Sequence, residues 1–152
     1  MLRQDINEAL KTAMKAKDRR ATLTLRLILA ALKDRDIAAR GNGDDSGISD
    51  DAVLDMLQKM IKQRHDSIEQ YQKGDRPDLV DQERQEIEII GRFLPKQMNE
   101  AEMVDAIGTV IEELGADCIK DMGRTMGVLK KRCAGRMDFS KAALMVKQRL
   151  GA

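Results

Sequence analysis

The chain has 152 residues, of which 42% are apolar, 35% are charged and only 2% are aromatic, and its net charge is +1. This length predicts one or two small domains, and the scarcity of aromatic residues argues against a β-sandwich or a β-barrel. A net charge near zero excludes a protein that attracts polyanions over its whole surface, so such binding would have to come from local patches.

Apolar residues at helical spacing predict an all-α fold, and residues 1–94 are expected to form an N-terminal domain of several helices. A loop over residues 41–47 is indicated by three glycines and two aspartates. Ser49 is expected to cap the helix that follows this loop, and Pro77 suits the first turn of the next helix. Pro95 is expected to end that helix and to mark the domain boundary. The predicted helices cover residues 2–17, 19–40, 49–72 and 77–94. The second of them is the most apolar and is expected to be central, with more than one side buried.

Residues 95–152 are expected to form a small C-terminal bundle of three helices. Asn99 and Glu102 have the spacing of a capping box, with Asn in place of Ser or Thr. Gly115 is a natural stop for the helix that they begin. The three predicted helices begin after Asn99, at about Lys120 and after Asp138.

Charge is distributed unevenly within this second domain. Residues 95–119 carry one base and six acids, a net charge of −5, whereas residues 120–152 carry nine bases and two aspartates, a net charge of +7. Bases of this kind either contact phosphates or form a solvated helix face that complements the helix dipole. The candidate nucleic-acid-binding residues are Arg124, Lys130, Lys131, Arg132, Arg136 and Lys141.

Glycines accompany these bases in the segment DMGRTMGVLKKRCAGRMD, residues 121–138. Gly123 and Gly127 are four residues apart and share one face of a helix, where missing side chains allow another backbone to come close. Gly135 is a third candidate for such an approach. The backbone that comes close belongs either to a neighbouring helix of the bundle or to an RNA. No aromatic residue lies among the bases of residues 121–138, so contact with the outside of a folded RNA fits better than stacking on single-stranded bases.

Catalytic and metal-binding patterns are not found in the sequence. Cys118 and Cys133 fit no metal or CxxC spacing, and His65 is the only histidine and accompanies no nucleophile. We therefore predict no catalytic residue, metal or cofactor. No apolar run approaches the roughly 20 residues that cross a membrane. Reduced thiols and the lack of a secretory signal predict a cytosolic protein.

Arg26 and Glu83 are charges at apolar positions of predicted helices. A buried charge without a partner costs several kcal/mol, so such charges tend to be paired. We expect each of them to meet an opposite charge within the N-terminal domain, with pairing to one another as one arrangement.

Three segments together resemble the YqeY family over nearly the whole chain: LTLRLILAALKD, RPDLVDQERQEIEIIGRFLP and KDMGRTMGVLKKRCAGRMDFSKA. That family is similar to the tail domain of the B subunit of the glutamine-dependent tRNA amidotransferase. The resemblance implies an all-α protein of two parts, the second of which shares the fold of that tail. In the amidotransferase the tail contacts tRNA, while glutamine hydrolysis and amide transfer take place elsewhere. Residues that match the shared motif are Gly123, Gly127, Gly135, Arg136 and Asp138.

The resulting expectation is a tRNA-binding accessory module that catalyses no reaction by itself, with tRNA as its partner. One alternative is a protein-interaction module, in which the face of Gly123 and Gly127 and the methionines dock a helix of a protein partner. Another is a component of a carbon–nitrogen ligase that uses glutamine as the amido donor, an activity that the family kinship implies. The sequence predicts no oligomeric state.

Overall fold

The computed structural model describes residues 1–151, and within them it contains seven α-helices and no strand. This confirms the predicted all-α fold. By its internal contacts the chain divides into two compact units, Met1–Leu94 and Pro95–Ala152. None of the described helices is both long and apolar enough to cross a lipid bilayer.

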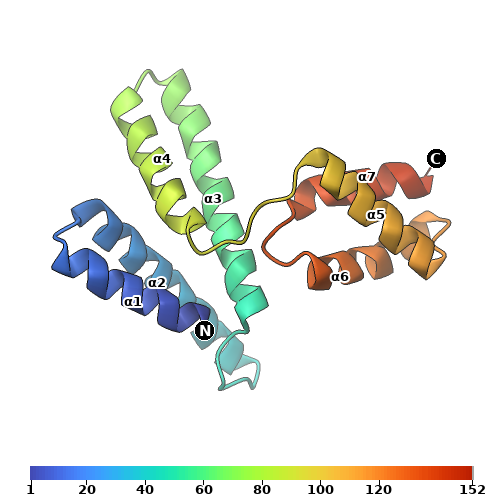
Figure 1. Cartoon of the computed structure of the whole chain (residues 1–152), viewed down its shortest axis with the longest axis horizontal. Coiled ribbons are helices and arrows are strands. Elements are labelled where there is room, and N and C mark those ends of the chain that lie inside the picture. Colours follow the sequence, from blue (N-terminus) through green and yellow to red (C-terminus); the bar gives the residue numbers. More distant parts are fainter. Residues whose placement is uncertain (152) are drawn as a thin grey trace. The chain divides into compact units, whose positions relative to one another are not determined.

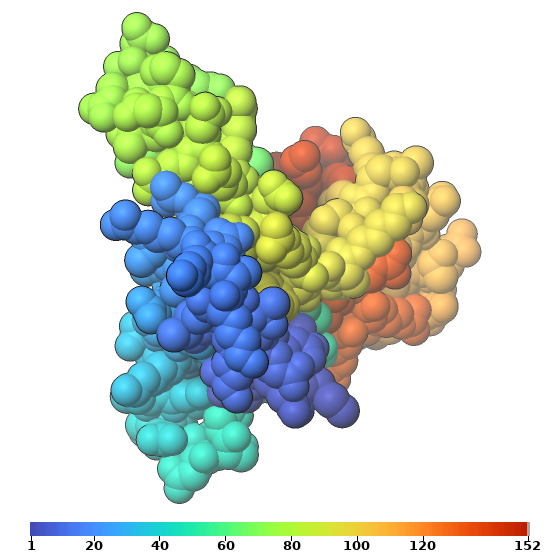
Figure 2. Space-filling model, turned by 60° about the vertical axis from the view of Figure 1, so that its left-hand side comes forward, coloured from blue at the N-terminus to red at the C-terminus, as the bar shows by residue number. Residues whose placement is uncertain are grey.

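The N-terminal unit consists of two helix pairs (Figure 1). Its helices are α1 (Leu2–Lys15), α2 (Arg19–Gly41), α3 (Asp50–Lys73) and α4 (Pro77–Gly91). α1 packs along α2, α3 packs along α4, and α2 also contacts α4 and α3. Figures 1 and 2 both place the turn between α3 and α4 at the opposite end of this unit from the loop before α3.

Local capping signals set the helix starts. The Ser49 side chain accepts a hydrogen bond of 3.2 Å from the Ala52 amide, and Pro77 occupies the first turn of α4, as predicted. α1 ends at Lys15, two residues earlier than expected, because Lys17 adopts a left-handed backbone with φ of 56°. This turn places Asp18 to cap α2 by accepting a 3.1 Å hydrogen bond from the Ala21 amide.

The core of the N-terminal unit is aliphatic, and α2 contributes to it from one side only. Its buried residues are Ile6, Ala13, Ala21, Leu25, Ile28, Leu32, Val53, Met56, Leu57, Met60, Ile89 and Ile90. The other side of α2 lies open, with Leu23, Leu27 and Ile37 exposed by 44%, 49% and 53%. We predicted that α2 is buried on more than one side. One face along the length of the helix is exposed instead, so this prediction is wrong.

Arg26 and Glu83 do not form an ion pair. Arg26 is exposed on the open side of α2 and has no ion pair within residues 1–151. Glu83 is half-buried, and burial together with the nearby Glu86 raises the pKa of its carboxyl. The carboxylate that is buried and paired is Glu86, because it lies on the core side of α4. It accepts a 3.0 Å hydrogen bond from Arg64 and lies 3.7 Å from the Arg20 guanidinium.

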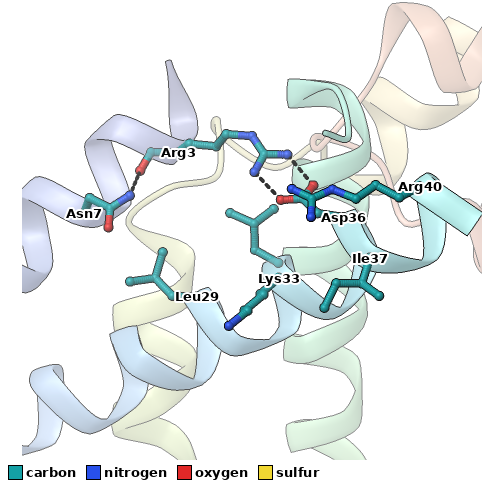
Figure 3. Close-up of a pocket in the computed structure, with 8 residues that line it drawn as sticks. Arg3, Asn7, Leu29, Lys33, Asp36, Ile37 and Arg40 are labelled. Atoms are coloured by element: carbon teal, nitrogen blue, oxygen red, sulfur yellow. Dashed lines mark hydrogen bonds and ion pairs between the residues drawn. The ribbon is translucent and has the colours of Figure 1, made fainter. Parts of the chain in front are cut away.

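A second ion pair joins α1 to the far end of α2 (Figure 3). Arg3 donates two hydrogen bonds of 2.6 Å to the Asp36 carboxylate, which also accepts one of 2.9 Å from the Ile48 amide. The Arg3 guanidinium and this amide lower the pKa of Asp36 to about 2. The pair therefore fixes α1, α2 and the chain that leads into α3 at one point.

We expect the replacement Asp36→Asn to lower the free energy of unfolding at neutral pH by about 1–2 kcal/mol, since the pair is partly exposed to solvent. The pKa of Asp36 is depressed in the folded chain, from an ordinary 3.8 to about 2. Its contribution is therefore full above pH 3.8 and is lost as the pH falls through about 2. Urea unfolding of both chains between about pH 7 and pH 2 checks this. A difference that stays constant over this range contradicts it.

The C-terminal unit contains three α-helices and a short 3-10 turn. They are α5 (Glu100–Leu114), η1 (Ile119–Asp121), α6 (Met122–Arg132) and α7 (Phe139–Gly151). Asn99 and Glu102 form the predicted capping box, and Gly115 ends α5 with a left-handed φ of 60°. Helices α5, α6 and α7 each contact the other two. Their shared core consists of Met103, Ile107, Val110, Ala116, Leu129, Cys133, Met137, Ala142, Val146 and Leu150.

Candidate nucleic-acid interface

The outer side of α6 is formed by Gly123, Gly127, Lys130 and Lys131, all of which are exposed. Residues spaced by three, four and seven positions share one side of a helix, and the two lysines fall on either side of the line that joins the glycines. The buried Leu129 belongs to the opposite side, which faces the core. We call the four exposed residues the glycine–lysine face.

The glycines of this face meet open space. A methyl group built at Gly123 or at Gly127 would have no neighbouring atom within 4 Å. The reading in which another helix of the bundle fills this gap is therefore wrong. The α6 backbone therefore remains accessible to another molecule at this face.

Gly135 has a different role from these two glycines. It is buried in the turn between α6 and α7 and adopts φ of 74°, a left-handed conformation that favours glycine. Its carbonyl accepts a 2.6 Å hydrogen bond from the Gln97 side chain, and the Arg136 carbonyl accepts one of 2.8 Å from the Met98 amide. The close approach at Gly135 is thus made by the segment that precedes α5.

Each of the three predicted arginines contacts a carboxylate of its own unit. Arg124 lies 3.1 Å from Asp121, Arg132 lies 2.6 Å from Glu113, and Arg136 lies 4.0 Å from Glu102. The Arg132 guanidinium lowers the pKa of the Glu113 carboxyl. These arginines remain about half exposed, so each pair stabilises the fold only weakly. A polyanion would have to compete with the carboxylates for them.

The predicted lysines are free of such competition. Lys130, Lys131 and Lys141 are exposed and form no ion pair within residues 1–151. Lys120, in the turn directly before α6, is exposed and unpaired in the same way, although it was not among the predicted residues. The predicted set of six therefore divides into arginines that are paired with carboxylates of their own unit and lysines whose charge is available.

Asp121 sets the start of α6. Its carboxylate accepts a 3.2 Å hydrogen bond from the Asp117 amide, and its carbonyl accepts one of 2.9 Å from the buried Thr125 hydroxyl. The Asp117 amide is the largest cause of a lowered pKa at Asp121, followed by the charge of Arg124. These contacts fix the direction in which α6 leaves the turn, and with it the direction of the glycine–lysine face.

The same turn contains a group of possible metal ligands. One donor atom each from Asp117, Cys118 and Asp121 lies within 4.8 Å of the others. Asp117 and Cys118 are exposed, and the Arg124 guanidinium already neutralises Asp121. Exposed acidic groups are common without an ion, and no other observation indicates a cation at this turn.

Neither cysteine has the surroundings of a nucleophile. Cys133 is buried in the core of the C-terminal unit, whereas Cys118 is exposed on its surface. His65 is exposed on α3, in the N-terminal unit. The Cys118 thiol donates a long hydrogen bond of 3.7 Å to the Asp121 carboxylate, whose pKa is lowered, and the sequence places no histidine in the C-terminal unit. Neither thiol therefore has the histidine partner that commonly activates a cysteine nucleophile.

The fold and this face together define a class: an all-helical chain of two small units that presents an open, cationic helix face on the second. The family model of Yqey-like proteins matches residues 3–150, so the chain belongs to the YqeY family. This confirms the family predicted from the sequence.

Among the curated relatives are yeast proteins named altered inheritance of mitochondria protein 41, mitochondrial. The protein from Lachancea thermotolerans is 38% identical over 72% of this chain and 58% of its own length. The Saccharomyces cerevisiae protein is 32% identical over 86% of this chain and 66% of its own length. This chain therefore spans less than two thirds of the length of these relatives.

The names of these relatives contradict the predicted cytosolic location, because both proteins are described as mitochondrial. That prediction rested on unpaired cysteines and on the lack of a secretory signal. Neither feature distinguishes the cytosol from the mitochondrion, so the prediction was wrong.

Proposed function

We propose that the C-terminal unit of this chain binds the backbone of a folded RNA, with tRNA as the principal ligand, and that it does so without catalysing a reaction. The observation that carries this proposal is the glycine–lysine face, where bare helix backbone lies between two unpaired lysines. The resemblance of the chain to the amidotransferase tail supports the choice of tRNA.

The chemistry of the face suits a phosphate backbone. With no side chain at Gly123 and Gly127, a ribose–phosphate chain can approach α6 more closely than it could approach an ordinary helix. The Lys130 and Lys131 ammonium groups, one on each side, then act as point charges for its phosphates. Such contacts position a nucleic acid without reading its bases. Selectivity for tRNA would then come from shape.

The helix-docking alternative is weaker than the sequence suggested. It required exposed methionines beside the glycines, but Met122 and Met126 pack against the core of the C-terminal unit. The glycine–lysine face therefore offers a partner helix little apolar surface. The ligase alternative stays a prediction, which glutaminase and amide-transfer assays of the purified chain would test.

The change Gly127→Gln separates binding from folding. Glutamine is a good helix former and meets open space here, so the variant should gain up to about 1 kcal/mol in free energy of unfolding. The same side chain would stand between α6 and an RNA backbone. We therefore expect tRNA binding about tenfold weaker in a filter-binding assay.

Gly91→Gln is the matched control, because an added side chain at Gly91 of α4 also meets open space. This variant should bind tRNA like the unchanged chain. If Gly127→Gln is well folded and binds tRNA with undiminished affinity, the RNA backbone does not approach this face and the proposal fails.

A further inference from the structure

The open side of α2 carries a regular apolar stripe. Leu23, Leu27, Ala30, Asp34 and Ile37 follow one another at alternating intervals of four and three residues, and all five are exposed. This alternation is the core spacing of a coiled coil, in which such a seam packs against a second helix. The stripe spans four turns, about 21 Å along the helix axis, and no part of the N-terminal unit covers it.

A row of cations borders this stripe on one side. Arg19, Arg26, Lys33 and Arg40 are spaced by seven residues, so they form one line along α2. All four are exposed, and none forms an ion pair within residues 1–151. This position beside the seam is where coiled coils place the charges that select a partner.

The far end of the row borders a hollow of about 300 Å³ between α1 and α2. Leu29, Leu32 and Ile37 line it together with Lys33 and Arg40. In Figure 3 the Lys33 side chain points away from the Arg3–Asp36 pair. In Figure 2 α2, coloured mid-blue to cyan, runs along the left edge of the view, at the surface of the unit. The stripe, the row and the hollow thus form one continuous surface of mixed apolar and cationic character.

We propose that the open face of α2 docks an amphipathic helix of another protein, with apolar residues at coiled-coil spacing and a flank of glutamates or aspartates. The apolar side chains of the docked helix would be buried against the apolar stripe of α2. The acidic flank of the docked helix would lie against the cation row. A large apolar side chain of the docked helix would enter the hollow.

Other occupants fit less well. A second copy of α2 packed antiparallel would bring two cation rows together, which is repulsive. In a parallel pair the cation row of one copy would face the opposite edge of the seam on the other copy. That edge contains Ala31 and Ala38, which offer no carboxylate. A membrane would bury the Asp34 carboxylate, which lies in the middle of the apolar stripe. An RNA would offer no apolar surface to the leucines of the stripe.

The test uses the full chain and a synthetic three-heptad peptide, labelled with fluorescein, with leucine at the core positions, one central asparagine and glutamate at both flanking positions. The flanking glutamates repel one another, so this peptide does not pair with itself. A second peptide with lysine in place of every glutamate is the matched control. Fluorescence anisotropy is expected to show binding of the acidic peptide and none of the basic one.

The charge-reversed chain Arg26→Glu/Lys33→Glu should bind the acidic peptide at least about tenfold more weakly and should gain affinity for the basic peptide. Leu23→Gln/Leu27→Gln should bind neither peptide. All four residues are exposed, so these chains should melt like the unchanged protein. The control Lys11→Glu/Lys15→Glu makes the same charge change on α1 and should leave binding unaltered.

The proposal is overturned if the unchanged chain does not bind the acidic peptide, or if charge reversal fails to exchange the two peptides. It is also overturned if the α2 variants lose binding to phosphatidylserine vesicles, which would assign the face to a membrane. A loss of tRNA binding in the Arg26→Glu/Lys33→Glu chain would assign the face to RNA instead. The glycine–lysine face is unchanged in these variants, so either proposal can fail without the other.

Discussion

Replacement of Glu86 by glutamine is expected to lower the free energy of unfolding of the N-terminal unit by about 3 kcal/mol. The Glu86 and Arg64 side chains are only 11% and 13% exposed, and the change leaves the guanidinium without its counter-charge. The estimate lies at the low end for a broken buried ion pair because Arg64 keeps a 3.1 Å hydrogen bond to the Met60 carbonyl. The free energy of unfolding from urea titrations of both chains gives the value.

Glu83→Gln is the matched control, three residues earlier on the same helix. Burial and the Glu86 charge raise the pKa of the Glu83 carboxyl, so its ionised form is unfavourable in the folded chain. Removing this charge should leave the stability unchanged or raise it slightly. Equal losses in the two variants would show that the Glu86 cluster does not hold the fold in the way that we describe.

Features that depend on neighbours in the sequence were predictable from the sequence. The Ser49 cap, the capping box of Asn99 and Glu102, and the left-handed Gly115 are all present in the structure. Each involves groups within about one helical turn, so residue type and spacing are sufficient to predict it.

Features that depend on how helices face one another were not predictable. Arg26 interrupts an apolar run, yet it lies on the open side of α2, because the core takes Ala21, Leu25 and Ile28 instead. The sequence contains leucines on both sides of this helix and does not show which side is buried. The buried ion pair consequently involves Glu86, one turn after the predicted Glu83.

The candidate interface illustrates the same limit. The density of bases after Lys120 was visible in the sequence, but the carboxylates that neutralise Arg132 and Arg136 belong to α5 and its cap. Only the packing of α5 against α6 brings them together. A count of charge overstates the available cationic surface, because Arg124, Arg132 and Arg136 are paired with carboxylates.

Charge reversal at two of the unpaired lysines has the second large expected effect. We expect Lys130→Glu/Lys131→Glu to weaken tRNA binding by about one to two orders of magnitude at roughly 0.1 M salt, because two phosphate contacts become repulsive. The dependence of log affinity on log salt concentration should become shallower by about 2. Both residues are exposed and unpaired, so the fold should be unaffected.

The most direct test of the proposed function is a titration of tRNA, over a range of salt concentrations, into three chains: the unchanged protein, Lys130→Glu/Lys131→Glu, and the control Lys11→Glu/Lys15→Glu. These two variants have the same net charge, so a general loss of positive charge would weaken binding equally in both. We predict that only the α6 variant loses affinity and salt dependence. Equal affinities for all three chains, or equal losses in the two variants, would contradict the claim that an RNA backbone binds at the glycine–lysine face.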